Sequence, residues 1–169
     1  IARQNFPAKD FKEFLAYVKA NKDKVTYANA GIGAASHLCG MLFMSAIDTD
    51  LTTVPYGGTG PAMNDLLGGT ADFMCDQTLN VLQPVNAGMI KAFAATTRQR
   101  LAVAPNLPTA AEAGLPGYTF TSWQGLVAPA GLAAAIVRRL NAEVAGLLAE
   151  PDRLDDITRQ ARHLAEVGV

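Results

Sequence analysis

The sequence predicts an α/β domain in which a mostly parallel sheet is covered by helices on both faces. Short β-type segments alternate with helical segments in the first part of the chain, and short turns join them. Half of the 169 residues are hydrophobic and 17% are charged, which suits a chain with one buried core. We therefore expect residues 1–169 to form a single α/β unit.

Charge and apolar runs exclude two classes of partner. The net charge is −1, so the surface is not built to attract nucleic acid. The longest apolar runs, such as residues 125–137, are broken by Pro129 and Gly131 and stay well short of the roughly 20 apolar residues that span a bilayer. The sequence starts at Ile1 without a leader, so any targeting segment has been removed or lies outside this sequence. The composition predicts a soluble domain.

Hydrophobic spacing and turn residues predict the elements of this domain. Phe11, Phe14 and Val18 recur at helical spacing and indicate the first helix. Two glycine turns, at residues 30–36 and 56–61, each follow a strand and precede a helix. The predicted order is a helix over 7–20, a strand over 25–28, a helix over 36–46, a strand over 51–55, a helix over 62–67, a strand over 71–75, a helix over 79–87 that accommodates Pro84 poorly, and a strand over 90–95.

After Thr96 the chain becomes rich in proline and glycine. We expect a short helix near residues 109–113 and a strand-like segment over 120–126, with Trp123 as an anchor of the core or of a junction between lobes. Three further elements are expected: a long amphipathic helix over 133–148, a last helix over 152–161, and a tail over 163–169 that could be a strand with no partner in this chain.

The cysteine and histidine residues do not predict a catalytic or metal site. Cys39 and Cys75 are too few for a disulfide scaffold and lack the spacing of a zinc site, so both are predicted to be small buried apolar side chains. His37 and Cys39 are two residues apart on a helix and cannot face each other, so no catalytic triad emerges. His37 is expected to bond nearby backbone. We expect no catalytic residue, no metal and no cofactor.

The two glycine turns predict a ligand site. In a parallel sheet the turns that follow the strands gather at one edge. A helix that begins after such a turn directs free N–H groups and the positive end of its dipole toward a carboxylate or phosphate. Residues 25–90 contain no Lys, Arg or Glu, so dipoles and hydroxyls would hold the anion, and exchangeably. The candidate ligand-binding residues are Ala30, Gly31, Ile32, Gly33, Ala34, Ser36, Tyr56, Gly57, Thr59, Gly60 and Asp76.

Several of these side chains have a second interpretation. The hydroxyls of Ser36 and Thr59 could cap their helices or donate to the ligand. Asp76 could fix a turn, hold an ordered water or receive a ligand amine. Tyr56 is a more plausible pocket wall than Trp123, because its ring can pack on aliphatic carbons while its hydroxyl stays polar.

Two other classes of function compete with simple anion binding. A Rossmann-type oxidoreductase would use Gly31-Ile32-Gly33, but Ser36 stands where the third glycine is expected and the strand over 51–55 ends in Pro55 and Tyr56 instead of an acid. An interaction module without a small ligand would have a filled crevice at the strand ends.

Three long segments carry a resemblance to one family. The runs TYANAGIGAASHL, VPYGGTGPAMNDLLGGTADFMCDQ and LPTAAEAGLPGYTFTSWQGLVAPAGL resemble the substrate-binding receptors of tripartite tricarboxylate transporters, also called Bug-type or TctC-like receptors. The resemblance extends from about Phe6 to the last helix. It implies one lobe of a two-lobed periplasmic receptor that closes on a small mono-, di- or tricarboxylate and passes it to membrane subunits of the transporter.

The resemblance also implies roles for residues. The turn over 30–34 would supply N–H groups to a ligand carboxylate, the turn over 56–60 would form the neighbouring wall, and Asp76 would face the cleft. Ala34 stands where relatives usually carry Ser or Thr, and Gly57 where many carry Lys or Arg. The chain resembles only the second lobe, so an uncovered apolar face would favour dimerisation of this lobe.

Overall fold

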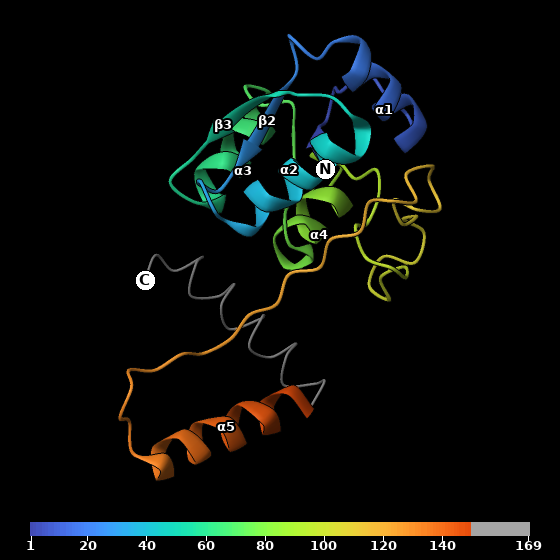
Figure 1. The fold of residues 1–169 in the computed structure, drawn as a ribbon. Coiled ribbons are helices and arrows are strands. Elements are labelled where there is room, and N and C mark those ends of the chain that lie inside the picture. Colours follow the sequence, from blue (N-terminus) through green and yellow to red (C-terminus); the bar gives the residue numbers. More distant parts are fainter. Residues whose placement is uncertain (150–169) are drawn as a thin grey trace. The chain divides into compact units, whose positions relative to one another are not determined.

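The computed structural model describes residues 1–149, and the chain divides into two compact units, residues 1–123 and 124–169 (Figure 1). Unit 1 contains all five strands of the described part and the candidate site. Unit 2 contributes helix α5 (Ala134–Ala149). None of the helices in the described part is long and apolar enough to cross a membrane. The single lobe predicted over residues 1–169 stays a prediction.

Unit 1 is built on a mixed sheet with strand order β3-β2-β4-β1-β5. Strand β2 is parallel to both β3 and β4, whereas β1 is antiparallel to β4 and β5. Strands β4 and β5 therefore point the same way, and β1 alone opposes the common direction, as the mostly parallel prediction requires. The strands are β1 (Ala2–Arg3), β2 (Thr26–Asn29), β3 (Thr52–Pro55), β4 (Phe73–Met74) and β5 (Ile90–Lys91).

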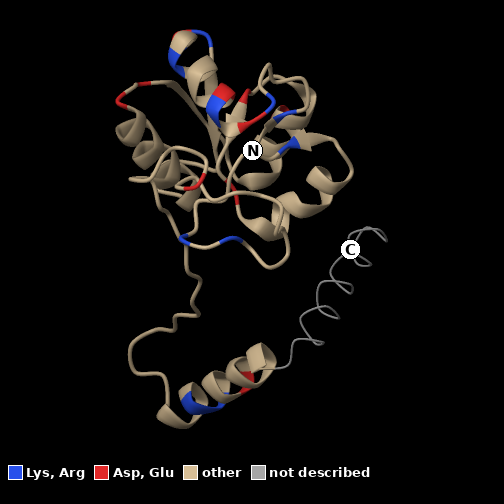
Figure 2. Ribbon diagram, turned by 90° about the vertical axis from the view of Figure 1, so that its right-hand side faces the viewer, with Lys and Arg blue, Asp and Glu red and all other residues tan. Residues whose placement is uncertain are grey.

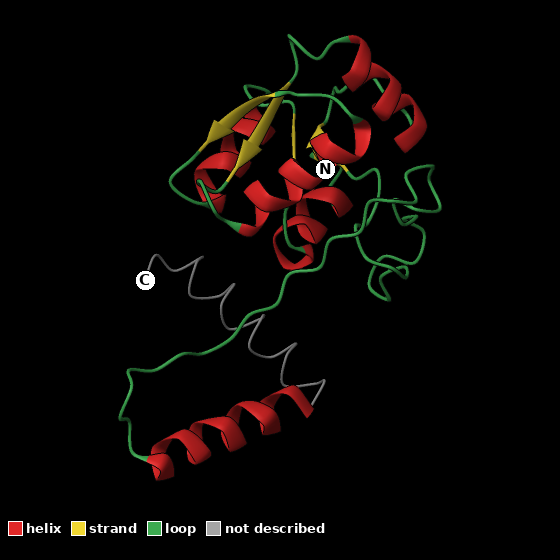
Figure 3. Ribbon diagram, in the orientation of Figure 1, coloured by secondary structure: helices red, strands yellow, loops and turns green. Residues whose placement is uncertain are grey.

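Successive strand residues face opposite layers, and helices cover both (Figure 3). Tyr27 and Phe73 are neighbours in the sheet and pack into one core with α1 (Phe11–Ala20) and α2 (Ala35–Ile47). Ala28 and Met74 come next along the same strands and pack with α3 (Thr59–Gly68), while α4 (Thr78–Asn86) adds partly buried side chains there. This alternation confirms an α/β unit covered on both faces.

Two helices begin at residues other than those predicted. Helix α1 begins at Phe11 and not at residue 7, because Asp10 caps it by accepting from the Glu13 amide at 2.8 Å. Helix α3 begins at Thr59, so Pro61 of the predicted turn lies in its first helical turn, where no N–H partner is needed. Helix α4 contains Pro84.

The segment after β5 departs most from the prediction. Residues 109–113 form a single turn, not a helix: Thr109 and Glu112 cap each other, but Gly114 follows with a φ of 109° and the chain leaves the helical path. The strand predicted over 120–126 does not form, and Trp123 is 86% exposed instead of anchoring a core. Helix α5 confirms the prediction over 133–148. The helix predicted over 152–161 and the tail over 163–169 lie outside the described residues.

The prediction for the two cysteines was wrong. Cys39 on α2 and Cys75 at the end of β4 form a disulfide. Both side chains reach the same core, because Cys39 lies one helical turn before the buried Phe43 and Cys75 lies two residues after the buried Phe73, on the same face of the strand. Two cysteines are too few for a scaffold of bridges but enough for one structural crosslink.

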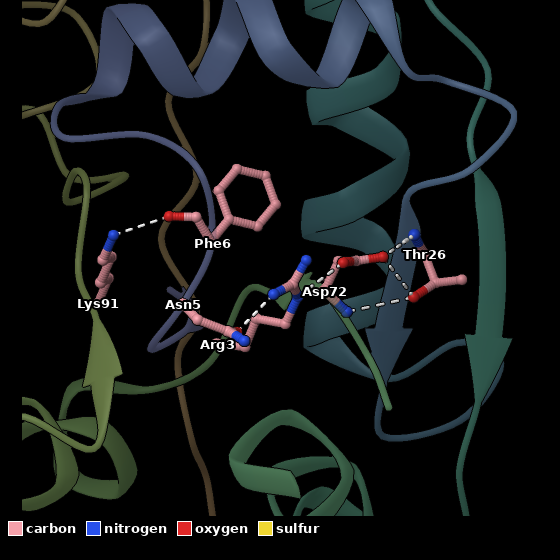
Figure 4. A network of polar contacts seen from close by, with 6 residues as sticks. All are labelled: Arg3, Asn5, Phe6, Thr26, Asp72 and Lys91. Atoms are coloured by element: carbon pink, nitrogen blue, oxygen red, sulfur yellow. Dashed lines mark hydrogen bonds and ion pairs between the residues drawn. The ribbon is translucent and has the colours of Figure 1, made fainter. Parts of the chain in front are cut away.

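A polar network joins Asp72, directly before β4, to Thr26 at the start of β2 and Arg3 at the end of β1, at the sheet edge opposite the glycine turns (Figure 4). Asp72 accepts from Arg3 Nε at 2.9 Å, from the Thr26 amide at 2.8 Å and from Thr26 Oγ1 at 3.1 Å. Arg3 also bonds Asn5, and Lys91 Nζ donates to the carbonyls of Phe6 and Ala8 at 2.7 and 3.0 Å. These bonds link Arg3 of β1 and Thr26 of β2 to Asp72, the residue directly before β4, and link Lys91 of β5 to the segment after β1.

Asp72→Ala is expected to lower the free energy of unfolding of unit 1 by about 2–3 kcal/mol, because a partly buried arginine and a backbone amide lose their shared acceptor. Chemical denaturation followed by circular dichroism measures the change. Asp50→Ala removes an exposed carboxylate with no bonded partner in the described part and serves as the control. Equal losses in the two variants would refute the role given to Asp72.

Candidate ligand site

The two glycine turns lie side by side at one edge of the sheet. Strands β2 and β3 are parallel neighbours, with Asn29 opposite Pro55, and each leads directly into its turn (Figure 1). The Tyr56 amide donates to the Asn29 carbonyl at 2.9 Å. Gly31 has a φ of 121°, and a Cβ there would lie 3.2 Å from the Tyr56 carbonyl oxygen. The expected gathering of the turns is therefore present, and Gly31 permits the close approach.

Most amides of the first turn are already bonded within the protein. The amides of Ala30, Gly31, Gly33 and Ala34 donate, in that order, to Ser36 Oγ at 2.9 Å, Asn29 Oδ1 at 3.0 Å, His37 Nδ1 at 3.2 Å and the Gly31 carbonyl at 3.1 Å. His37 bonds nearby backbone, as predicted. Only the Ile32 amide has no acceptor among the described residues, and the Ile32 side chain is 84% exposed. The first turn therefore offers a ligand few free N–H donors, and its main contribution is the path of the backbone.

The free donors lie at the starts of the two helices. In the part of the chain that the structure describes, the amides of Ala35, Ser36 and His37 at the start of α2 have no acceptor. The same holds for the four amides of residues 57–60 around the start of α3. Neither helix has a side-chain cap bond. Two sets of N–H groups at positive helix ends thus lie at one sheet edge, an arrangement that binds anions.

The three hydroxyl groups near these amides differ in their bonding. Ser36 Oγ accepts from the Ala30 amide and so braces the turn without capping α2. Thr59, the first residue of α3, has no bonded partner for its hydroxyl within residues 1–149. Tyr56 donates to Asp65 at 2.7 Å, and this bond, with partial burial, raises the pKa of Tyr56 to about 12. Tyr56 therefore presents a ring held by α3.

Asp76 follows β4, the strand that pairs with β2 on the side away from β3. Its Oδ1 accepts from the Gln77 amide at 2.7 Å and from Asn80 Nδ2 at 3.0 Å, which is the turn-fixing role. Its Oδ2 is buried without a partner in the described part. Asp76 borders a cavity of about 490 Å³ lined mainly by apolar side chains of unit 1, and neither glycine turn lines that cavity. Continuing the parallel register of β2 and β4 beyond Ala28 and Met74 places Asp76 beside Ala30, at the same sheet edge as the two turns, and its predicted role at the ligand stays a prediction.

Asn29 is a site residue that the sequence did not single out. Its side chain is fully buried and its Oδ1 accepts from Gly31, while its carbonyl accepts from Tyr56. One residue therefore bonds both turns. Its Nδ2 has no acceptor within residues 1–149. A polar residue ending an otherwise apolar strand directly before a glycine turn is the signal that could have identified it.

Asn29→Ala is expected to lower the free energy of unfolding by about 1–3 kcal/mol, because the Gly31 amide loses its buried acceptor. Urea denaturation gives the value. Asn64→Ala, at an exposed position of α3, is the matched control and should change stability by less than about 0.5 kcal/mol. Indistinguishable curves for the two variants would show that Asn29 does not hold the turn.

The electrostatic environment matches the sequence expectation. All lysines and arginines lie outside residues 25–90, so α2 and α3 carry neither. Figure 2 shows the lysines and arginines of the described part in blue. Within residues 25–90 an anion at this edge would therefore be held by backbone dipoles and hydroxyls. No group of three or more metal-ligating side chains is present in the described part.

Comparison with known proteins identifies the family. The model of the tripartite tricarboxylate transporter family receptor matches residues 1–161. The UPF0065 protein in the TAR-I ttuE-ttuC' intergenic region of Agrobacterium vitis is 40% identical over 151 residues, which are 89% of this chain and 44% of that protein. The chain thus spans about half the length of the curated relatives it matches.

Solved structures agree with this assignment. The periplasmic binding protein BugD is 46% identical, with a TM-score of 0.87 over 94% of this chain and 53% of that one. MatC from Rhodopseudomonas palustris, with bound malate, is 41% identical, with a TM-score of 0.84 over 90% and 52%. These matches leave the Rossmann-type alternative without support. The chain belongs to the tripartite tricarboxylate transporter receptor family, a family of solute-binding receptors.

Proposed function

We propose that this chain forms one wall of a carboxylate site in a solute-binding receptor. The observation that carries the proposal is the pair of unbonded amide sets, at the starts of α2 and α3, on one sheet edge. The glycine turns hold these helix starts close together, and the exposed Ile32 stands beside them. Such a wall binds the carboxylate group and releases it readily, because no cationic side chain clamps it.

The ligand class follows from this chemistry. Backbone amides recognise the carboxylate that mono-, di- and tricarboxylates share, and the relative MatC holds malate. We propose a small organic acid as ligand and no chemical conversion of it. The residues proposed to contact it are those at the helix starts, with Tyr56 as an adjacent apolar wall.

The partners and location are proposed from the family and from the disulfide. Membrane subunits of a tripartite transporter would receive the ligand. The bridge between Cys39 and Cys75 supports an extracytoplasmic location, because disulfides persist in oxidising compartments. The relative BugD is a periplasmic binding protein.

Self-association of unit 1 is a separate proposal. Leu38, Met41 and Leu42 are each about half exposed and lie together on one face of α2. Light scattering at increasing concentration should detect dimers, and a mass that stays monomeric would refute this proposal.

The binding proposal is tested by two-dimensional amide NMR of this chain with malate. One wall should bind weakly, so we expect shifts that saturate only at millimolar ligand or above. The amides that shift should be those of residues 32, 35–37 and 57–60. Dimethyl malate, which lacks both charges, is the matched control and should leave these signals unchanged.

Three results would overturn it. These are no shift at tens of millimolar malate, shifts confined to other regions, and equal shifts with the ester. Micromolar affinity would contradict the view that this wall binds only weakly by itself.

A further inference from the structure

Helix α2 is attached to the sheet, next to its free amides, by hydrogen bonds, a disulfide and close packing on Tyr27. Tyr27 of β2 donates its hydroxyl proton to the Ser36 carbonyl and accepts from the Cys75 amide at 3.3 Å. One buried hydroxyl therefore joins the first turn of α2 to the end of β4. Burial raises the pKa of Tyr27 far above its usual range, so the hydroxyl keeps its proton and remains a donor.

The disulfide joins the same two segments. Cys39 lies one turn after Ser36, and Cys75 is the residue whose amide bonds Tyr27. Tyr118 adds a contact from a distant loop by donating to the Cys39 carbonyl at 3.1 Å. Gly40 completes the arrangement, since a Cβ there would lie 2.0 Å from the Tyr27 ring. The ring lies directly against the helix backbone.

These contacts lie within one helical turn of the amides proposed to bind carboxylate. The amides of residues 35–37 move with the first turn of α2, while those of residues 57–60 are carried by β3, which pairs with β2. The separation of the two amide sets therefore depends on how α2 is held against β2 and β4. A carboxylate that must bond both sets is sensitive to errors well below 1 Å.

We propose that Tyr27 and the Cys39–Cys75 disulfide are positioning residues of the carboxylate site. They act through α2 and do not touch the ligand. This inference rests on the proposed function, because it concerns the same two sets of amides. It goes further by naming the contacts that fix the distance between these two sets, which are the disulfide and the two hydrogen bonds of the Tyr27 hydroxyl.

The experiment compares malate titrations, followed by the amide signals of residues 35–37 and 57–60. The proteins are the oxidised wild-type chain, the chain reduced with dithiothreitol, Cys39→Ala/Cys75→Ala and Tyr27→Phe. We expect the Kd for malate to rise roughly tenfold in each altered form, equivalent to about 1.4 kcal/mol. Residual dipolar couplings of α2 without ligand should also show a changed helix orientation relative to β4.

The matched control is Asp72→Ala, which destabilises the unit from the opposite sheet edge; Asp72 bonds Arg3 and Thr26, and within residues 1–149 it makes no hydrogen bond to α2. It should leave the Kd and the orientation of α2 unchanged. Titrations are run at a temperature well below the unfolding midpoint of each variant. If the double cysteine variant does not fold, Tyr27→Phe still tests the proposal, because it keeps the aromatic ring and removes only the hydroxyl.

The outcomes separate the two proposals. Wild-type Kd values in the altered forms would overturn the positioning role and leave the proposed function intact. An equal loss of affinity in Asp72→Ala would also overturn it, since general destabilisation would then explain the effect. Absence of malate shifts in the oxidised wild-type chain would overturn both.

Discussion

Replacing Cys39 and Cys75 together by alanine is expected to lower the free energy of unfolding of unit 1 by about 3–4 kcal/mol. The bridge joins residues separated by 36 positions, and closing a loop of that length restricts the unfolded chain by about this amount. The loop contains β3, α3 and most of α2, so the bridge limits the unfolded freedom of both site helices. Urea denaturation of the oxidised wild type and the double variant measures the difference.

Reduction provides an independent check on the same quantity. Dithiothreitol-treated wild type should unfold near the midpoint of the double variant, because both lack the crosslink and differ only in two thiol groups. The Asp50→Ala protein, with its bridge intact, should lose the same stability on reduction as wild type. Coincident curves for oxidised and reduced wild type would exclude a stabilising role for the bridge.

The regular part of the fold was predictable because its signals are local. Strand and helix patterns alternate through residues 25–91, and the alternation of Tyr27 with Ala28 matches the two buried layers. Strand β1 was not predicted, because its two residues carry no periodic pattern. It joins the sheet through long-range pairing with β4 and β5, which only the folded chain supplies.

The strand predicted over 120–126 did not form, because strand formation there depends on tertiary contacts and not on local composition. The aromatic run around Trp123 resembles a strand, but within residues 1–149 the backbone of residues 120–123 bonds the rest of unit 1 through Phe120, whose amide donates to the Thr96 carbonyl. A strand needs a neighbour that accepts and donates along its length. Within residues 1–149 this segment has none, so the β-type composition does not become a strand.

The meeting of the two glycine turns was predictable from the sequence, but the bonding of their amides was not. Glycine turns after adjacent parallel strands meet at one edge on general grounds, and they do so here. Which amides stay free depends on side chains such as Asn29 and His37, whose bonds to the turn the spacing alone does not show. The predicted donors therefore move from the turn itself to the helix start that follows it.

The disulfide could have been expected from the resemblance. A periplasmic receptor folds under oxidising conditions, where a lone pair of buried cysteines is more readily bridged than free. The strand register supports the same conclusion, since Cys75 faces the layer of Tyr27 and Phe73, against which α2 packs. The expected compartment and the strand register together predict the disulfide better than the number of cysteines does.

Gly40→Ala is expected to cost about 3 kcal/mol or more of unfolding free energy, although alanine favours helices. Its Cβ would lie 2.0 Å from Tyr27 Cε1 and 2.4 Å from Cζ, so the ring or the helix must move. The ring has little room, because it packs edge-on to Phe73 at 5.1 Å and its hydroxyl is bonded on both sides. Thermal and urea denaturation measure the loss.

Two further variants of unit 1 test whether contact with the Tyr27 ring causes this loss. Gly68→Ala, at the last residue of α3 with no atom near its added Cβ, should leave stability unchanged or slightly raised. In a Tyr27→Leu background, Gly40→Ala should cost much less than in wild type, because the ring that the methyl group meets is gone. An additive double-mutant cycle would show that contact with Tyr27 is not the cause, and the close packing of α2 on this ring would lose its stabilising role.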